Sequence, residues 1–294
     1  MSNFVQQQHS ICNFSNEESW VILFPIEQSI KHKIESVGTP LKDWDIQIYR
    51  GVLTGYNEAF IISTEKREEI LAKCETEEER EKTAELIRPI LRGRDIKRYG
   101  YDWANLWLIN THNGVKGVMP RVDIMEYPAL KAHLDQYWDK ISKRADKGDT
   151  PYNLRNCAYL EDFFKPKVMY PNMTKYLPFY YDEKGFYQND KSFMITGTNV
   201  AYLTAFLNSS LFKFCFLNNF PELLGGTREL RKIFFDKIPV LEVDDNTNKQ
   251  FEELLLDIQQ EYTKSKAIAI DAIIFDLYKL TLEERNLIGF VEII

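Results

Sequence analysis

Two stretches constrain the fold and function of this chain most strongly: Gly51-Val-Leu-Thr-Gly-Tyr-Asn-Glu-Ala-Phe60 and, further along, Ile87-Arg-Pro-Ile-Leu-Arg-Gly-Arg-Asp-Ile-Lys-Arg-Tyr-Gly100. The first carries glycines at 51 and 55, with the polar residues Thr54, Tyr56 and Asn57 between apolar flanks. Glycine adopts turn conformations that other residues resist, so this pattern predicts a tight, polar-tipped loop. From 46 to 62 the sequence alternates or runs apolar on both sides of the glycines, which predicts strand, loop and strand.

The second stretch is strongly basic. Within eleven residues it carries five positive side chains and one acid, Asp95, whereas the whole chain has a net charge of −7. The positive residues are Arg88, Arg92, Arg94, Lys97 and Arg98. A concentrated basic patch on an acidic chain indicates a polyanionic partner, with nucleic acid as the first candidate.

Together and in this order, the two stretches resemble the TaqI-like C-terminal specificity domain. That module gives adenine-specific DNA methyltransferases and fused restriction-modification enzymes their target recognition. The resemblance runs from about residue 20 to the end of the chain. Further segments that carry it are Trp20-Val-Ile-Leu, 33–38, Pro40-Leu41, YPALKAHL at 127–134, FFKPKVMYPNM at 163–173, YLTAFLNSSLFKFCF at 202–216, GGTRELRKIFFDKIPV at 225–240 and IDAIIFDLYKLTLEE at 270–284.

The resemblance implies a function as well as a fold. We expect an α+β fold with mixed twisted β-sheets and peripheral helices, followed by a C-terminal helical segment. The implied role is sequence-specific recognition of double-stranded DNA in a bacterial restriction-modification protein. A catalytic domain, on the same polypeptide or on a separate subunit, would bind S-adenosylmethionine and methylate adenine at N6.

Composition sets wider bounds. With 294 residues, 44% of them hydrophobic, the chain can bury the core of one large domain or of two. Twelve Phe or Tyr residues lie between Tyr152 and Phe193. These aromatic residues can be explained in two ways. They can form a β-rich core, or a few of them can face a groove in which bases pack, and the sequence leaves both interpretations open.

Cysteine and histidine usage predicts no metal site. The four cysteines lie far apart, and His9 with Cys12 has ligand-like spacing but no second pair. Dispersed cysteines without a signal peptide or a membrane-length apolar run indicate a cytoplasmic protein without a membrane partner.

The chain divides by composition into three parts: a polar lead-in at 1–19, a DNA target-recognition domain at 20–240 and a C-terminal helical segment at 241–294. Within them we expect helices at 22–37, 127–146 and 200–220, a strand at 106–110, and a C-terminal pair of helices that packs on the main body or on a partner. From 65 to 85 the sequence holds nine acids and five bases, which predicts a solvated helical hairpin.

No catalytic residue is expected on this chain alone. An adenine methyltransferase needs an (Asn/Asp/Ser)-Pro-Pro-aromatic motif to hold the flipped base, and a glycine-rich turn after a strand for its cofactor. The sequence contains neither. The acids at 242–245 lie in a linker-like polar stretch, so an autonomous metal-dependent nuclease is the least favoured hypothesis.

Candidate DNA-binding residues fall into two sets. Phosphate contacts are expected from Arg92, Arg94, Lys97, Arg98, Arg228, Arg231 and Lys232. Base contacts are expected from loop residues, namely Thr54, Tyr56, Asn57, Asn113, Lys116, Asn172, Lys175, Thr227 and Arg228. Each of these residues also has an alternative explanation: a Lys or Arg can be an ordinary exposed surface charge, and an Asn can stabilise a turn. On the sequence alone, reversing Arg92 and Arg94 to Glu is expected to abolish DNA binding and to leave the fold intact.

A second hypothesis belongs to a different class. The 65–85 hairpin and the C-terminal helices suit a module that docks another protein, in which case the basic clusters are ordinary surface. Salt separates the two hypotheses, because phosphate contacts weaken steeply as salt rises and apolar docking does not.

Overall fold

The computed structural model describes residues 24–292, and it confirms a mixed fold of helices and several small sheets. The polar lead-in, His9, Cys12 and Trp20 lie outside the described residues. The helices are α2 (Pro25–Val37), α3 (Asn57–Phe60), α4 (Thr64–Ala72), α5 (Glu77–Leu86), α6 (Pro128–Asp135), α7 (Trp138–Ile141), α8 (Val200–Asn208), α9 (Ser210–Phe216), α10 (Lys232–Phe235), α11 (Asp245–Gln260), α12 (Lys264–Leu277) and α13 (Leu282–Ile288).

A four-stranded antiparallel sheet forms the centre of the molecule, in the order β10 (Tyr180–Asp182), β8 (Lys167–Pro171), β12 (Ser192–Gly197) and β2 (Ile46–Arg50). Its register pairs Phe193 with Arg50 and Ser192 with Pro171. Every residue of β8 is buried, because helices and loops cover both faces of the strand. After the buried Lys167, which pairs with Asp182, the strand is a continuous run of apolar and aromatic residues instead of an alternating pattern.

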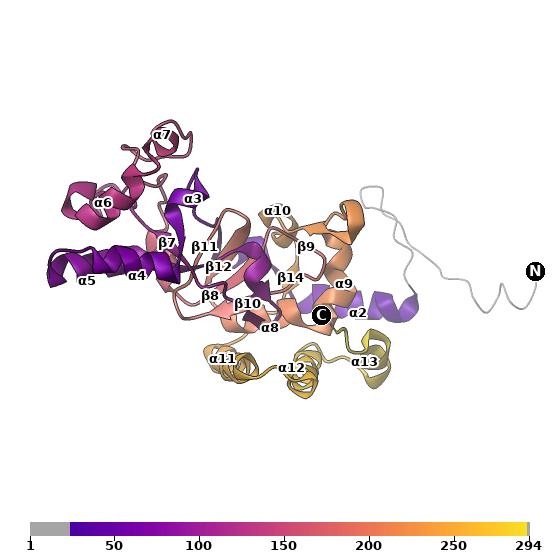
Figure 1. Ribbon diagram of the computed structural model, residues 1–294. Coiled ribbons are helices and arrows are strands. Elements are labelled where there is room, and N and C mark those ends of the chain that lie inside the picture. Colours follow the sequence, from indigo (N-terminus) through magenta and orange to yellow (C-terminus); the bar gives the residue numbers. More distant parts are fainter. Residues whose placement is uncertain (1–23, 293–294) are drawn as a thin grey trace, which may run out of the picture.

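A second four-stranded sheet has the order β11 (Tyr187–Gln188), β4 (Ile87–Leu91), β7 (Leu106–Ile109) and β3 (Ile61–Ser63). β11 runs parallel to β4, and the other pairs are antiparallel. Helices α4 to α7 lie at this end of the molecule (Figure 1). A bridge between Val52 and Asn189 connects the regions of the two sheets. The remaining strands form pairs: β1 (Thr39–Pro40) with β14 (Pro239–Val240), β9 (Met173–Thr174) with β13 (Arg228–Glu229), and β5 (Ile96–Lys97) with β6 (Gly100–Tyr101).

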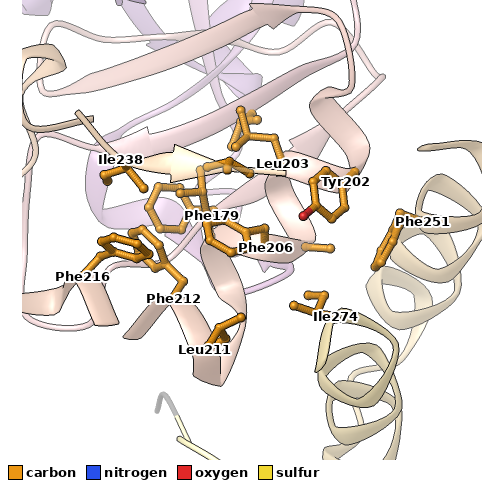
Figure 2. Packing of buried hydrophobic residues seen from close by; sticks show 14 of the residues in the cluster. Phe179, Tyr202, Leu203, Phe206, Leu211, Phe212, Phe216, Ile238, Phe251 and Ile274 are labelled. Atoms are coloured by element: carbon orange, nitrogen blue, oxygen red, sulfur yellow. The ribbon is translucent and has the colours of Figure 1, made fainter. Parts of the chain in front are cut away.

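The larger hydrophobic core lies around α8, all of whose residues are buried. Figure 2 shows Phe206 and Tyr202 of this helix between the sheet and the C-terminal helices, with Phe251 of α11 facing Tyr202. The ring centroids of Tyr202 and Phe251 are 5.1 Å apart. Ile274 of α12 belongs to the same cluster, so the C-terminal helices share the core of the central sheet.

The structure corrects three sequence-based element predictions. The segment after the glycine loop first forms the helical turn α3, because Ala59 and Phe60 are both buried there, and becomes a strand only at β3. The helix predicted at 127–146 breaks at 136–137, where backbone N–H groups bond to carbonyls three residues back. The helix predicted at 200–220 breaks at Ser209, whose hydroxyl accepts the amide of Phe212 and caps α9.

The C-terminal segment contains three helices where a pair was expected, and the third is fastened to the start of the fold. Glu284 of α13 accepts hydrogen bonds from the Lys33 Nζ (2.6 Å) and the Ser29 hydroxyl (2.7 Å) of α2. It also accepts the backbone amide of Thr281 at 2.7 Å, which closes a capping box. Burial opposes ionisation, but these bonds hold the pKa of Glu284 at about 2.

Among the described residues no single helix is long and apolar enough to cross a membrane; α8 and the helical stretch 210–219, which begins with α9, reach that length only as a pair bent by 68°.

The packing of Phe251 predicts a large loss of stability on truncation. Phe251→Ala removes a fully buried ring and is expected to lower the free energy of unfolding by about 3–5 kcal/mol. The control Leu282→Ala removes a side chain that is 75% exposed and is expected to change it by less than about 0.5 kcal/mol. Urea denaturation monitored by tryptophan fluorescence compares them, and equal losses would contradict this packing.

The Glu284 contacts predict a pH-dependent contribution to stability. The folded-state pKa is depressed, so the stabilisation is complete above the unfolded value near 4.5 and declines as pH falls toward about 2. Glu284→Gln is expected to cost about 1–3 kcal/mol at pH 7, and the difference from the natural chain is expected to shrink below pH 4.5. Urea midpoints from pH 7 to pH 3.5 test this, and a difference that stays constant with pH would refute it.

Candidate nucleic-acid interface

The basic stretch forms a tight turn between β4 and the β5–β6 hairpin. The 3-10 helix η2 (Gly93–Asp95) makes the turn, and the chain then continues into β5. Asp95 and Ile96 point inward and are buried, whereas Arg94 and Lys97 are exposed. The turn therefore presents two cations to solvent from a rigid base.

Arg92 holds this turn together. Its Nε and Nη2 donate to the two carboxylate oxygens of Asp95 at 2.9 and 2.8 Å, and its backbone N–H donates to the same carboxylate at 2.8 Å. The hydrogen-bonded Asp95 raises the pKa of the Arg92 guanidinium. Because a Glu at position 92 would place two carboxylates together, reversing Arg92 would disturb the turn as well as the surface charge. A test of DNA contact therefore belongs at Arg94.

Arg98 is buried instead of exposed. Its Nη2 donates to the carbonyl of Asn208 at 2.8 Å, and its Nη1 donates to the carbonyl of Val291 at 3.1 Å. The Asn208 side chain in turn donates to the carbonyl of Phe179 at 2.7 Å. In the structure Arg98 thus ties the basic turn to the end of α8, to the central sheet and to the C-terminal segment.

Residues 171–178 lie against the basic turn. The two segments and Tyr262 line a hollow of about 330 Å³. Lys175 is exposed at its edge, and neither Lys175 nor Arg94 forms an ion pair with any described residue. The backbone of Asn172 accepts the amide of Leu230 at 2.8 Å, and its side-chain oxygen is buried without a partner in the described part of the chain.

A third segment, the hairpin at 222–229, packs on the second. β13 pairs with β9 so that Arg228 lies opposite Thr174, and a further bridge joins Glu222 to Arg228. The Arg228 guanidinium donates to the carbonyl of Phe220 (2.7 Å) and to the Glu222 carboxylate (3.0 Å). Thr227 is half-buried, and its carbonyl accepts the amide of Leu223.

We call the face made by these three segments, together with the adjoining residues 231–233, the basic surface. Its cations are Arg94, Lys97, Lys175, Arg228, Arg231 and Lys232. Arg228 pairs with Glu222 (3.0 Å), and three other cations pair with nearby acids: Lys97 with Asp102 (3.5 Å), Arg231 with Glu229 (2.8 Å) and Lys232 with Asp236 (2.6 Å). All three cations are more than half exposed, and such pairs contribute little to stability, so the cations can exchange a carboxylate for a phosphate.

The remaining predicted residues belong to a second group, which we call the loop cluster: 54–57, 111–121 and 144–156. Thr54 is buried, and its hydroxyl donates to the Asn57 side-chain oxygen at 2.5 Å. Tyr56 is half-buried with its ring centroid 6.1 Å from that of Tyr137, and Asn57 is exposed at the first residue of α3. Asn57 is therefore the accessible member of this loop.

Arg144, which sequence reasoning missed, holds the loop cluster together. Its guanidinium is buried and donates to the carbonyls of Thr54, Asp146, Pro151 and Asn153. Burial lowers the pKa of Arg144 to about 10. Gly55 adopts a φ of +66°, and a Cβ there would lie 2.7 Å from the Asp146 carbonyl, so the loop requires glycine. A single basic residue in a charged helix end gives no sequence signal for this role.

The 111–121 loop presents Lys116 beside an open hollow of about 610 Å³, lined by that loop, Asp149 and Asn156. Asn113 is engaged inside the cluster, since its side chain donates to the Asp149 carboxylate and accepts the Asp149 amide. Lys116 is exposed, whereas Asn113 serves as a turn-stabilising side chain.

Most of the aromatic residues between 152 and 193 belong to the hydrophobic core. Most of its rings are buried or half-buried, and the exposed ones are Phe164 and Tyr176. Tyr176 lines the hollow beside the basic turn, which suits the groove-facing role for that one ring. Within residues 24–292 no cluster of three or more His, Cys, Asp or Glu side chains is arranged to hold a metal ion.

Comparison with known proteins gives a family and a fold. The model of the TaqI-like C-terminal specificity domain matches residues 88–240, just over half of the chain. No sequence among the curated proteins matches the chain.

Two solved structures share the fold. The type IIG restriction endonuclease BpuSI superposes with a TM-score of 0.51 at 16% identity, over 87% of this chain and 34% of BpuSI. The type IIL restriction-modification enzyme MmeI, solved in complex with DNA, superposes with a TM-score of 0.57 at 11% identity, over 83% of this chain and 34% of MmeI. The chain spans about a third of the length of either enzyme.

Because Arg98 is buried and Arg94 is exposed, we expect truncation of Arg98 to destabilise the protein strongly and truncation of Arg94 to leave its stability almost unchanged. Arg98→Ala leaves two carbonyls without their charged donor and is expected to lower the free energy of unfolding by about 2–4 kcal/mol. Arg94→Ala, a change at an exposed and unpaired residue, is expected to alter it by less than about 0.5 kcal/mol. Urea denaturation of both variants tests the assignment, and a stable Arg98→Ala protein would show that this anchor is dispensable.

Proposed function

Because the chain belongs to the family of TaqI-like C-terminal specificity domains, we propose that it recognises a specific sequence in double-stranded DNA on behalf of a restriction-modification enzyme. The observation that carries this proposal is the meeting of three separate segments in the basic surface. Two cations of that surface, Arg94 and Lys175, have no acidic partner in the described part of the chain. Cations held on a rigid face without carboxylates are suited to bind phosphates.

The basic surface and the loop cluster would have different roles in DNA binding. The basic surface would hold the DNA backbone and fix the register of the duplex, which carries no sequence information itself. The loop cluster would place Asn57 and Lys116 toward base edges, where amide side chains suit adenine and lysine suits guanine. Arg144 would keep these loops in one conformation, and a preorganised loop loses less entropy on binding.

The chemistry would reside in a catalytic domain, on the same polypeptide or on a separate subunit. We propose that this domain binds S-adenosylmethionine, extrudes an adenine from the duplex that the present chain holds, and methylates it at N6. The two enzymes of similar fold, a type IIG restriction endonuclease and a type IIL restriction-modification enzyme, are about three times as long, and the second was solved with DNA bound. We also propose a bacterial cytoplasmic location, where chromosomal DNA is accessible.

Charge reversal on the basic surface is expected to weaken DNA binding. The double variant Arg94→Glu/Lys175→Glu should bind a mixed-sequence duplex at least about tenfold more weakly, and the slope of log Kd against log salt should fall by about 2. The control Lys31→Glu/Lys249→Glu changes the same charge at two exposed lysines of α2 and α11, outside the segments of the basic surface, and should retain most of the affinity. Fluorescence anisotropy at several salt concentrations measures both quantities.

Equal losses in the two double variants would indicate attraction by overall charge alone and contradict the assignment of this face. Undiminished DNA affinity in Arg94→Glu/Lys175→Glu would contradict it as well. Absence of DNA binding by the natural chain at low salt would favour protein docking through α4, α5 and the C-terminal helices.

A further inference from the structure

A fully exposed leucine projects from the basic surface. Leu224 lies at the tip of the 222–229 hairpin and is 100% exposed, and its neighbour Leu223 is 39% exposed. Gly225 and Gly226 follow, with φ of +77° and +76°, and a Cβ on either would meet no atom within 4 Å. The tip therefore stands clear of the rest of the described chain.

The base of this tip is rigid. The Leu223 amide donates to the Thr227 carbonyl at 2.6 Å, and Arg228 fixes the incoming strand through the Phe220 carbonyl. The outgoing strand is paired with β9. A fixed hairpin with an apolar end can insert into a partner without first losing conformational entropy.

The side chains around the tip indicate which class of partner it contacts. Exposed apolar side chains of the same face are Met173 (53%), Tyr176 (54%) and Ile233 (58%). Unpaired or weakly paired cations of the basic surface are Arg94, Lys175 and Arg231. A protein partner of ordinary composition would bury these cations at a cost, whereas DNA offers phosphates to them and an apolar base step to the leucine.

We propose that Leu224 is a wedge that enters the base stack of the bound duplex, partly unstacks one step and kinks the DNA. This inference rests on the proposed function and extends it, because it assigns a deformation of DNA to one side chain. Apolar residues that insert between base pairs in this way bend the duplex and cost a few kcal/mol of stacking, which the added protein contacts offset.

The wedge predicts which DNA is bound best. Unstacking costs least where stacking is already weak, so a duplex with a one-nucleotide gap should be favoured over an intact duplex of the same sequence. A neighbouring 2-aminopurine reports the event directly, because its fluorescence rises when its stacking is lost.

The test uses the full chain, intact and gapped 20-base-pair duplexes, and two matched variants. Leu224→Ser and Ile233→Ser each remove one exposed aliphatic side chain from the same face, and thermal denaturation checks that both fold. The natural chain and Ile233→Ser should bind the gapped duplex about fivefold or more tightly and raise 2-aminopurine fluorescence. Leu224→Ser should bind both duplexes equally without that rise.

The remaining outcomes distinguish failure of the wedge from failure of the proposed function. If Leu224→Ser keeps both the preference and the fluorescence rise, or if the natural chain binds duplex DNA without either, the wedge is refuted and the DNA-binding function stands. If the natural chain binds neither duplex, the proposed function fails with it. If sedimentation shows a dimer that Leu224→Ser dissociates, the tip binds a second copy of the chain and the wedge is refuted.

Discussion

The buried guanidinium of Arg98 is the interaction on which the rest of the structure depends. It joins the basic turn to the carbonyls of Asn208 at the end of α8 and of Val291 near the C-terminus. Buried charged groups are costly unless their hydrogen bonds are satisfied, so this contact favours one arrangement of three distant segments. With Arg98 turned inward, Arg92 paired to Asp95 and Arg94 turned outward, one short sequence supplies a buried anchor, an ion pair that holds the turn and an exposed cation.

The basic surface and the loop cluster are each held in place by a buried arginine. In each, a buried arginine donates to backbone carbonyls of separate segments: Arg98 to the end of α8 and to Val291, and Arg144 to the loops at 54 and 146–153. Carbonyl oxygens left inside a loop need donors, and the guanidinium supplies several in a fixed plane. The exposed residues nearby, including Asn57 and Lys175, therefore rest on ordered backbone. Order of this kind is what sequence discrimination requires, because a mobile contact adapts to any base.

Much of the fold could be predicted from periodicity and charge, and much of the site could not. The helices around 65–85 can be predicted from their dense charged helix formers, the helix at 245–260 from the helical spacing of its buried Phe251, Leu255 and Ile258, and the strand at 106–109 from its short apolar run. The breaks at Ser209 and at 136–137 depend on tertiary packing and on a serine cap, which a continuous apolar run conceals. Among the arginines, composition identified the basic turn, but only the fold distinguishes Arg98 inside from Arg94 outside. Arg144 carried no signal, since its partners are backbone atoms up to 90 positions away.

The central claim is that this face of the protein reads a defined DNA sequence, with phosphate contacts for register and loop residues for bases. The most direct measurement is selection from a randomised duplex pool by the purified full chain, first at low salt and then near physiological salt, followed by sequencing. The account predicts that a short motif is enriched and survives the higher salt, where non-specific phosphate binding is lost. A pool that stays random at both salt concentrations would contradict sequence-specific recognition by this chain.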